Sequence, residues 1–114
     1  MKTYRHLFED KVGFIYNGKH YDNKSYTMNY YNLVKDILDG VHGTKLPTGS
    51  ELTKMFGATV YTEYDEMPES VTTRRLYKEL GDIYVLTNKD IRGFNAAIDR
   101  ISKTLGTSVK YLEV

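Results

Sequence analysis

The chain contains no cysteine. This absence excludes disulfide bonds, thiolate metal ligands and cysteine nucleophiles, and it is typical of proteins that work in a reducing compartment. Long apolar runs are also lacking, because no stretch approaches the about 18 apolar residues that a membrane span needs. The first residues are too polar for the start of a secretion signal. We therefore expect a cytoplasmic protein with no membrane partner.

A dominant charge is lacking as well. The net charge is +1, so no overall field attracts nucleic acid, a membrane surface or an acidic substrate. Only two prolines occur, and nothing in the sequence resembles a linker between domains. The 114 residues, 40% hydrophobic and 27% charged, are enough for one domain with a substantial core. We expect a single domain over residues 1–114.

Recognisable catalytic and cofactor motifs are absent from the sequence. The loop around Gly40, Gly43 and Lys45 lacks the spacing of a phosphate-binding loop and follows a helix instead of opening one. No acid, base and nucleophile stand out together, and no residues have the spacing of zinc ligands. We expect neither an enzyme nor a cofactor, and we assign no catalytic residue and no metal ligand. One enzymatic alternative is a metal-independent nuclease in which two histidines, such as His6 and His20, exchange protons with RNA.

The last third of the chain carries the clearest structural signal. Apolar residues recur at helical spacing from Ile91 to Leu105, which predicts a helix over about residues 89–105. Thr87 fits the N-cap of this helix, Asp90 its first turn and Gly106 its C-terminal end. The β-prone runs at 83–86 and 108–112 complete a strand–helix–strand unit.

The first half of the chain predicts a hairpin and a helix. Asn17-Gly18 separates β-prone residues 12–16 and 19–21, and this pair is the strongest sequence signal for a tight hairpin. Residues 3–8 offer a further strand, and residues 49–56 a short helix. A longer helix is expected over about residues 25–39, capped by Ser25 or Thr27 and ended by Gly40. Its apolar face comprises Tyr30, Leu33, Val34, Ile37, Leu38 and Val41.

Residues 58–87 predict a three-stranded meander, with strands at 58–64 and 83–86. Residues 70–80 are ambiguous, because Pro68-Glu69-Ser70 resembles a helix entry while Val71-Thr72-Thr73 is β-branched and makes no helical stripe. We favour a strand there. The expected fold is α+β, a mainly antiparallel sheet of hairpin, meander and last strand, with the two main helices packed on one face. If the last helix returns to the same sheet, strands 83–86 and 108–112 are parallel.

Tyrosine and lysine interleave between residues 16 and 31. Tyrosine offers rigid contact area with a polar tip, which favours protein interfaces, and bases stack on tyrosine rings while lysines contact phosphate. The structural alternative is that several rings cover the core, as Tyr30 should. We predict that the partner-binding residues are Tyr16, Lys19, His20, Tyr21, Lys24, Tyr26 and Tyr31.

An acidic turn gives a second set of candidates: Glu63, Asp65, Glu66 and Glu69. Such turns are usually solvated loops, although paired carboxylates can also bind magnesium or imitate the phosphates of a nucleic acid. The neighbouring Arg74 and Arg75 would point to opposite faces of a strand, which weakens a phosphate-clamp interpretation.

No motif is long enough to indicate a family. The main hypothesis is a small intracellular binding protein that docks on a larger protein and modulates or inhibits it. The tyrosine-rich, lysine-rich composition without tryptophan is typical of small proteins encoded by phages or mobile elements of AT-rich bacteria. The alternative from a different class is a nucleic-acid-binding module that uses the same tyrosine and lysine surface.

Overall fold

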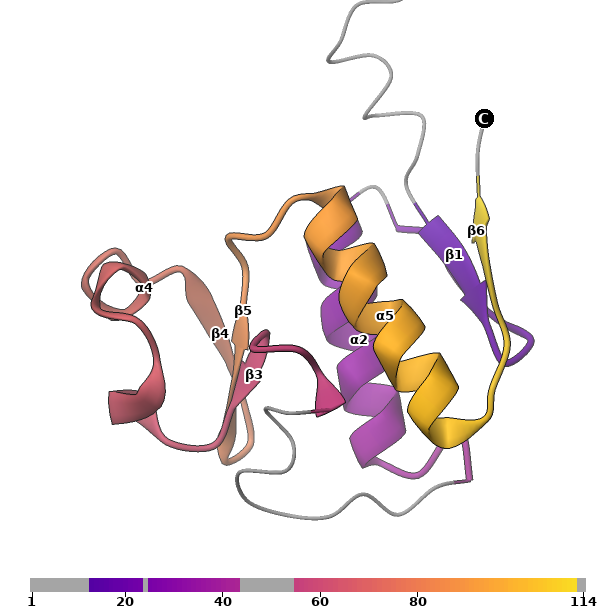
Figure 1. The fold of residues 1–114 in the computed structure, drawn as a ribbon, viewed down its shortest axis with the longest axis horizontal. Coiled ribbons are helices and arrows are strands. Elements are labelled where there is room, and N and C mark those ends of the chain that lie inside the picture. The colour runs from indigo at the N-terminus through magenta and orange to yellow at the C-terminus, as the bar shows by residue number, and fades with distance from the viewer. Residues whose placement is uncertain (1–12, 24, 44–54, 113–114) are drawn as a thin grey trace, which may run out of the picture.

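A computed structural model describes residues 13–23, 25–43 and 55–112, and these residues form an α+β fold (Figure 1). The fold class is therefore the one that the sequence predicts. The possible strand at residues 3–8 and most of the short helix at residues 49–56 lie outside the described residues.

The first sheet contains the predicted hairpin. Strand β1 (Gly13–Tyr16) lies between β2 (Lys19–Tyr21) and β6 (Val109–Leu112), and it pairs antiparallel with both. Asn17 and Gly18 both have positive φ, 49° and 85°, as a type I′ turn requires. The turn is also attached to β6, because the Asn17 N–H donates to the Ser108 carbonyl at 2.8 Å.

The two main helices are close to their predicted ranges. Helix α2 (Tyr26–Leu38) begins after Ser25, whose hydroxyl accepts from the Met28 N–H. Helix α5 (Ile91–Leu105) begins after Asp90, which caps it in place of the predicted Thr87. It ends at Gly106, whose φ of 68° is the expected left-handed stop.

The second sheet comes from the middle of the chain. It contains β3 (Val60–Tyr61), β4 (Tyr77–Leu80) and β5 (Ile83–Leu86) in the order β3-β5-β4, all antiparallel. Three strands are present as predicted, but their order is not that of a meander. The most apolar strand, β5, takes the central position, where both of its edges are paired and three of its four residues, Ile83, Val85 and Leu86, are buried.

The prediction of a strand over residues 70–80 is confirmed only for residues 77–80. Pro68 opens a short helix α4 (Glu69–Thr73), and only after a left-handed residue, Arg75 with φ 54°, does β4 begin. The predicted strand at 58–64 is likewise shorter, since a 3₁₀ turn η1 (Tyr64–Glu66) follows β3. Tertiary packing determines that residues 69–73 form a helix, because Val71 of α4 is buried on the sheet despite its β-branched character.

The two helices lie between the two sheets (Figure 1). Their buried residues form one core with the inner faces of both sheets, and the ring of Phe94 lies 4.8 Å from that of Tyr30 between centroids. Val41, predicted on the apolar face, instead lies beyond the end of α2 and is 53% exposed.

The expectation of one sheet is therefore corrected to two. Helix α5 leads from β5 in one sheet to β6 in the other, so these strands are not parallel neighbours. The physical reason is that each sheet has an apolar inner face, and the helix pair covers both at once.

Candidate interaction surfaces

The structure buries much of the predicted tyrosine surface. Tyr16 is 0% exposed and Tyr21 is 4% exposed, and both rings lie in the main core. The prediction that these rings are free to contact a partner is wrong. Strand alternation explains the error: Phe14, Tyr16 and Tyr21 share the face of the first sheet that is turned toward the helices.

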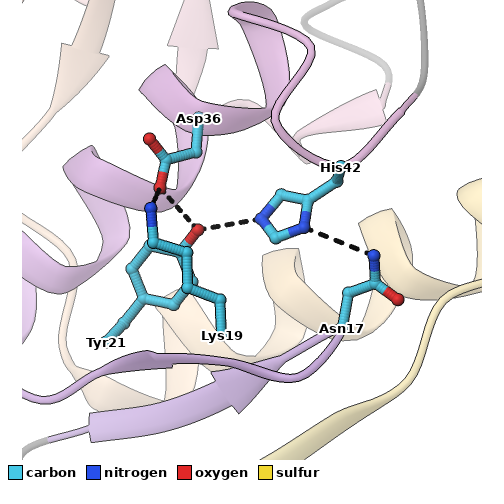
Figure 2. A network of polar contacts seen from close by, with 5 residues as sticks. All are labelled: Asn17, Lys19, Tyr21, Asp36 and His42. Carbon is cyan, nitrogen blue, oxygen red and sulfur yellow. Dashed lines mark hydrogen bonds and ion pairs between the residues drawn. The ribbon is translucent and has the colours of Figure 1, made fainter.

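The hydroxyl of Tyr21 belongs to a polar group that we call the hairpin network, which comprises Asn17, Lys19, Tyr21, Asp36 and His42 (Figure 2). Tyr21 Oη donates to Asp36 Oδ2 at 2.7 Å and lies 2.8 Å from His42 Nε2. Lys19 Nζ donates to the same carboxylate oxygen at 2.6 Å. The network therefore connects the β1–β2 hairpin to α2 and to the turn that follows it.

One assignment of hydrogen-bond donors and acceptors satisfies every contact in the hairpin network. The Asn17 side-chain nitrogen, which can only donate, lies 3.4 Å from His42 Nδ1. The proton of the neutral imidazole then lies on Nε2, which donates to Tyr21 Oη, and Tyr21 donates to Asp36. Burial and the bond to Asp36 both raise the pKa of Tyr21, so its phenol stays protonated as this arrangement requires.

Burial also lowers the pKa of His42, so the imidazole is neutral at neutral pH. Burial alone would raise the pKa of Asp36, but hydrogen bonds from Lys19 and Tyr21 outweigh it and lower that pKa. Both ring nitrogens of His42 and the Tyr21 hydroxyl are thus already engaged with neighbours. The network holds the hairpin in place and leaves no imidazole nitrogen free to act on a substrate.

The other predicted residues do not gather on one surface. Lys19 is exposed at the hairpin network, and His20 is exposed on the opposite face of the sheet, in register with Ile15. Tyr26 is half-buried and donates to Asn95 Oδ1. Lys24 lies outside the described residues, as does His6 of the hypothetical histidine pair. Partner binding by the exposed members stays a prediction.

Tyr31 leads to a different surface. Its hydroxyl donates to the Glu79 carbonyl at 3.2 Å, and the Lys78 ammonium lies 5.8 Å from the centre of its ring. Tyr31 therefore stands beside β4, away from the hairpin.

The outer face of the second sheet carries a tyrosine cluster in which Tyr64 is exposed and Tyr77 and Tyr84 are half-buried. Tyr64, Tyr77 and Tyr84 meet edge to face, with ring centroids 5.6–6.0 Å apart. Tyr64 is 44% exposed and, with Val41, is one of the two large hydrophobic residues exposed within the described ranges. We call these three rings the tyrosine face.

The strand register explains why Tyr77 and Tyr84 share a face. Glu79 lies opposite Tyr84, and Tyr77 lies two residues from Glu79 along β4, so all three side chains point away from the helices. The same face carries a small second core, in which Tyr61, Met67, Val71 and Leu86 are buried. The segment from η1 through α4 covers that core and leaves the tyrosine face at its border.

Charged side chains surround the tyrosine face. A shallow depression of about 330 Å³ is lined by Tyr64, Arg75, Tyr77 and Glu79. The predicted acidic residues are all exposed on the adjoining segment: Glu63, Asp65, Glu66 and Glu69. Within the part of the chain that the structure describes, none of these four carboxylates forms an ion pair. The surface thus combines aromatic area with exposed carboxylates, which would attract a cation.

Strand β4 forms an edge of its sheet. The Thr87 N–H donates to the Leu76 carbonyl at 2.9 Å, so by antiparallel alternation Lys78 and Leu80 also direct their main-chain groups to β5. The main-chain groups of Tyr77 and Glu79 consequently point away from β5, toward the open edge of the sheet. The Tyr31 hydroxyl occupies the Glu79 carbonyl, and the two N–H groups and the Tyr77 carbonyl have no partner among the described residues.

Sequence reasoning identified the acidic turn but missed the tyrosine face beside it. Tyr77 and Tyr84 stand on either side of Gly81-Asp82, and Gly81 has a positive φ of 59° in the tight β4–β5 turn. The predicted meander already implies a tight turn between residues 80 and 83, and following the side-chain alternation across that turn would have placed both tyrosines on one face.

Comparison of the chain with protein-family models, with curated proteins and with solved structures gives no match in any of the three. No helix within the described ranges is long and apolar enough to cross a membrane. Residues 13–23, 25–43 and 55–112 also contain no group of three or more side chains that could hold a metal ion. Function is therefore inferred from the surfaces of the molecule.

Proposed function

We propose that the protein works by binding a partner protein, and that the tyrosine face is the centre of the docking surface. The observation that supports this is the exposure of Tyr64 within a cluster of three tyrosines at a sheet edge. Tyrosine is enriched at the centres of protein interfaces because its ring gives large contact area at low entropic cost.

The charges around the tyrosine face favour a protein over a nucleic acid. Tyrosine rings can stack on bases, but such sites also need cations along the phosphate path. The segment beside Tyr64 instead presents carboxylates, Glu63, Asp65 and Glu66, which would repel phosphate. A nucleic acid therefore becomes an outcome of the test and not the proposal.

The size of the surface indicates what kind of contact to expect. A stable interface buries roughly 800 Å² on each partner, and a buried aromatic residue supplies about 150–250 Å². Three tyrosines therefore provide the anchor of an interface, and the flanking η1 segment and β4 provide its rim. Docking on a larger protein in the cytoplasm would modulate or block the surface that it covers.

The test is capture of partners from an extract of the cell that carries the gene, with variants on each sheet compared in parallel. Tyr64→Ser and Tyr77→Ser should each lose the partner at least tenfold. His20→Ser and Lys110→Ser, exposed on the outer side of the first sheet, are the matched controls and should retain it. Melting curves of all four establish that they fold.

Two results would contradict the proposal. Partners retained equally by all four variants would place binding elsewhere on the molecule. Loss of the captured material after nuclease treatment, together with a steep fall of binding as salt rises, would show that the partner is a nucleic acid.

A further inference from the structure

We propose that the partner contributes an extended segment that adds to the outer edge of β4 as a fourth, antiparallel strand of the second sheet. The inference rests on the proposed function above and specifies the partner that this surface fits. Addition of a strand to an exposed edge is a recurring way of binding peptides, in which main-chain hydrogen bonds give affinity and alternate side chains give specificity.

The main chain of β4 is suited to this role. The Tyr77 N–H, the Tyr77 carbonyl and the Glu79 N–H face outward without a partner in the described residues. Two residues of an antiparallel segment, placed opposite Tyr77 and Glu79, would bond to these groups. The Glu79 carbonyl, which already accepts from Tyr31, has a second lone pair for the incoming segment.

The side chains of β4 define the sequence that fits. On the tyrosine face, a lysine or arginine opposite Glu79 would form a cross-strand ion pair, and an aromatic residue opposite Tyr77 would extend the ring cluster. On the other face, an acidic residue would lie opposite Lys78. Read from its N-terminus, the antiparallel segment would therefore carry a basic, an acidic and an aromatic residue in succession.

A second copy of the chain does not meet these requirements. Antiparallel pairing of β4 with itself places Lys78 opposite Lys78 of the second copy, or Glu79 opposite Glu79 of the second copy, in the two registers that pair most of the strand. A third register, with Tyr77 opposite Tyr77 of the second copy, pairs little of β4, because Arg75 just before it has a left-handed φ of 54°. Like charges directly opposite each other destabilise a strand pair, and lysine on an edge strand is a common protection against self-association. The charges of β4 thus favour a different chain with the complementary order.

The probe is a displayed library of random dodecapeptides, selected on the full chain. The expected result is enrichment of peptides with Lys or Arg, then Asp or Glu, then an aromatic residue. The enriched peptides are then synthesised, and their binding is measured by fluorescence anisotropy. Glu79→Lys should weaken them at least tenfold, and exchanging the basic residue of the peptide for Glu should restore binding to this variant.

Main-chain methylation provides the decisive comparison. Methylating the amide nitrogen of the basic or the aromatic peptide residue, whose N–H groups face β4, should weaken binding at least tenfold. Methylating the acidic residue between them, whose N–H points away, is the matched control and should change affinity less than threefold.

The outcomes separate this inference from the proposed function. Peptides that depend on Tyr64 and Tyr77 but tolerate methylation at every position would overturn strand addition and leave protein binding intact. Enriched peptides whose charge preference does not reverse with Glu79→Lys would overturn the predicted register. A selection in which no peptide depends on Tyr77 or Glu79 would also overturn strand addition, whereas the proposed function is decided by the capture experiment alone.

Discussion

Two regions of the molecule are rich in tyrosine, and the structure uses them in opposite ways. Between residues 16 and 31, Tyr16 and Tyr30 are fully buried, and their hydroxyls bond to Thr107 and Thr59. On the outer side of the second sheet, Tyr64 is 44% exposed, and its ring meets that of Tyr77, which is half-buried against the second core. The same residue type therefore forms the core in one region and a candidate docking surface in the other.

The difference lies in where each hydroxyl finds its partner. A buried tyrosine must place its hydroxyl against another polar group, because leaving it unpaired costs about 1–3 kcal/mol. In the first region the chain supplies such partners inside the fold, including Asp36 for Tyr21. A sequence in which tyrosine and lysine alternate is thus consistent with two arrangements: a protein interface, or a core whose tyrosine hydroxyls reach polar partners at its border.

The largest expected effect on stability follows the loss of the Phe94 ring, through which α5 packs against two tyrosines of α2. Phe94 is 1% exposed, and its ring lies 4.8 Å from that of Tyr30 and 6.3 Å from that of Tyr26. Phe94→Ala should lower the free energy of unfolding by about 3–5 kcal/mol, because it opens a cavity in the core. Urea unfolding measures this, and a midpoint near that of the wild type would contradict the packing described for α5.

The next effect comes from removing one hydroxyl in each region. Tyr21→Phe should cost about 1–3 kcal/mol, since Asp36 loses a donor and His42 Nε2 loses its acceptor in a partly buried site. Tyr77→Phe, the matched change on the tyrosine face, should stay within about 0.5 kcal/mol of the wild type. Equal losses in the two variants would remove the distinction between the regions.

The third effect is a loss of stability in acid that originates in the hairpin network. Burial first, and Lys19 in addition, lower the pKa of His42 from its ordinary 6.5, although Asp36 opposes the shift. The unfolded chain therefore binds this proton more readily, and stability that is present above pH 6.5 is lost as the pH falls through the lower folded value. The melting temperature should drop over that window, and the lowered pKa of Asp36 adds a second drop below pH 3.8.

A variant isolates the contribution of the imidazole. His42→Gln cannot titrate but retains an amide that can donate to Tyr21, so its melting temperature should depend less on pH between 7 and 5, as followed by circular dichroism. The drop below pH 3.8 should persist, because Asp36 is unchanged. Parallel curves for wild type and variant between pH 7 and 5 would show that His42 is not the group responsible.

The sequence predicted those elements whose signals are local. Asn17-Gly18 requires positive φ at both residues, and Gly106 ends α5 in the left-handed conformation, so both boundaries could be found without tertiary information. The apolar stripes of α2 and α5 could also be recognised in the sequence, because a period of 3.6 residues is visible without knowing which surface the helix packs on.

Elements decided by distant contacts could not be predicted. Val71-Thr72-Thr73 has strand propensity but forms α4, because Val71 is buried against Leu86 and its neighbours on the sheet. The order β3-β5-β4 and the division into two sheets depend on how the helix pair fills the space between them. For the same reason the burial of Tyr16 and Tyr21 could not be predicted, since Asp36 and His42, which form hydrogen bonds with the Tyr21 hydroxyl, come later in the chain.

The last expected effect on stability is small, and it tests the comparison most directly. Tyr64→Ala removes a ring that is 44% exposed and touches only Tyr77 and Tyr84 among the described aromatic rings, so the free energy of unfolding should fall by about 1 kcal/mol or less. Its effect on a captured partner should be far larger, about 2 kcal/mol or roughly thirtyfold in affinity, because anchors at the centre of an interface dominate binding. Urea unfolding and titration with the partner measure the two quantities on the same sample. The opposite pattern, a large loss of stability with unchanged affinity, would make Tyr64 part of the second core and return the search for a docking surface to the exposed Lys19 and His20.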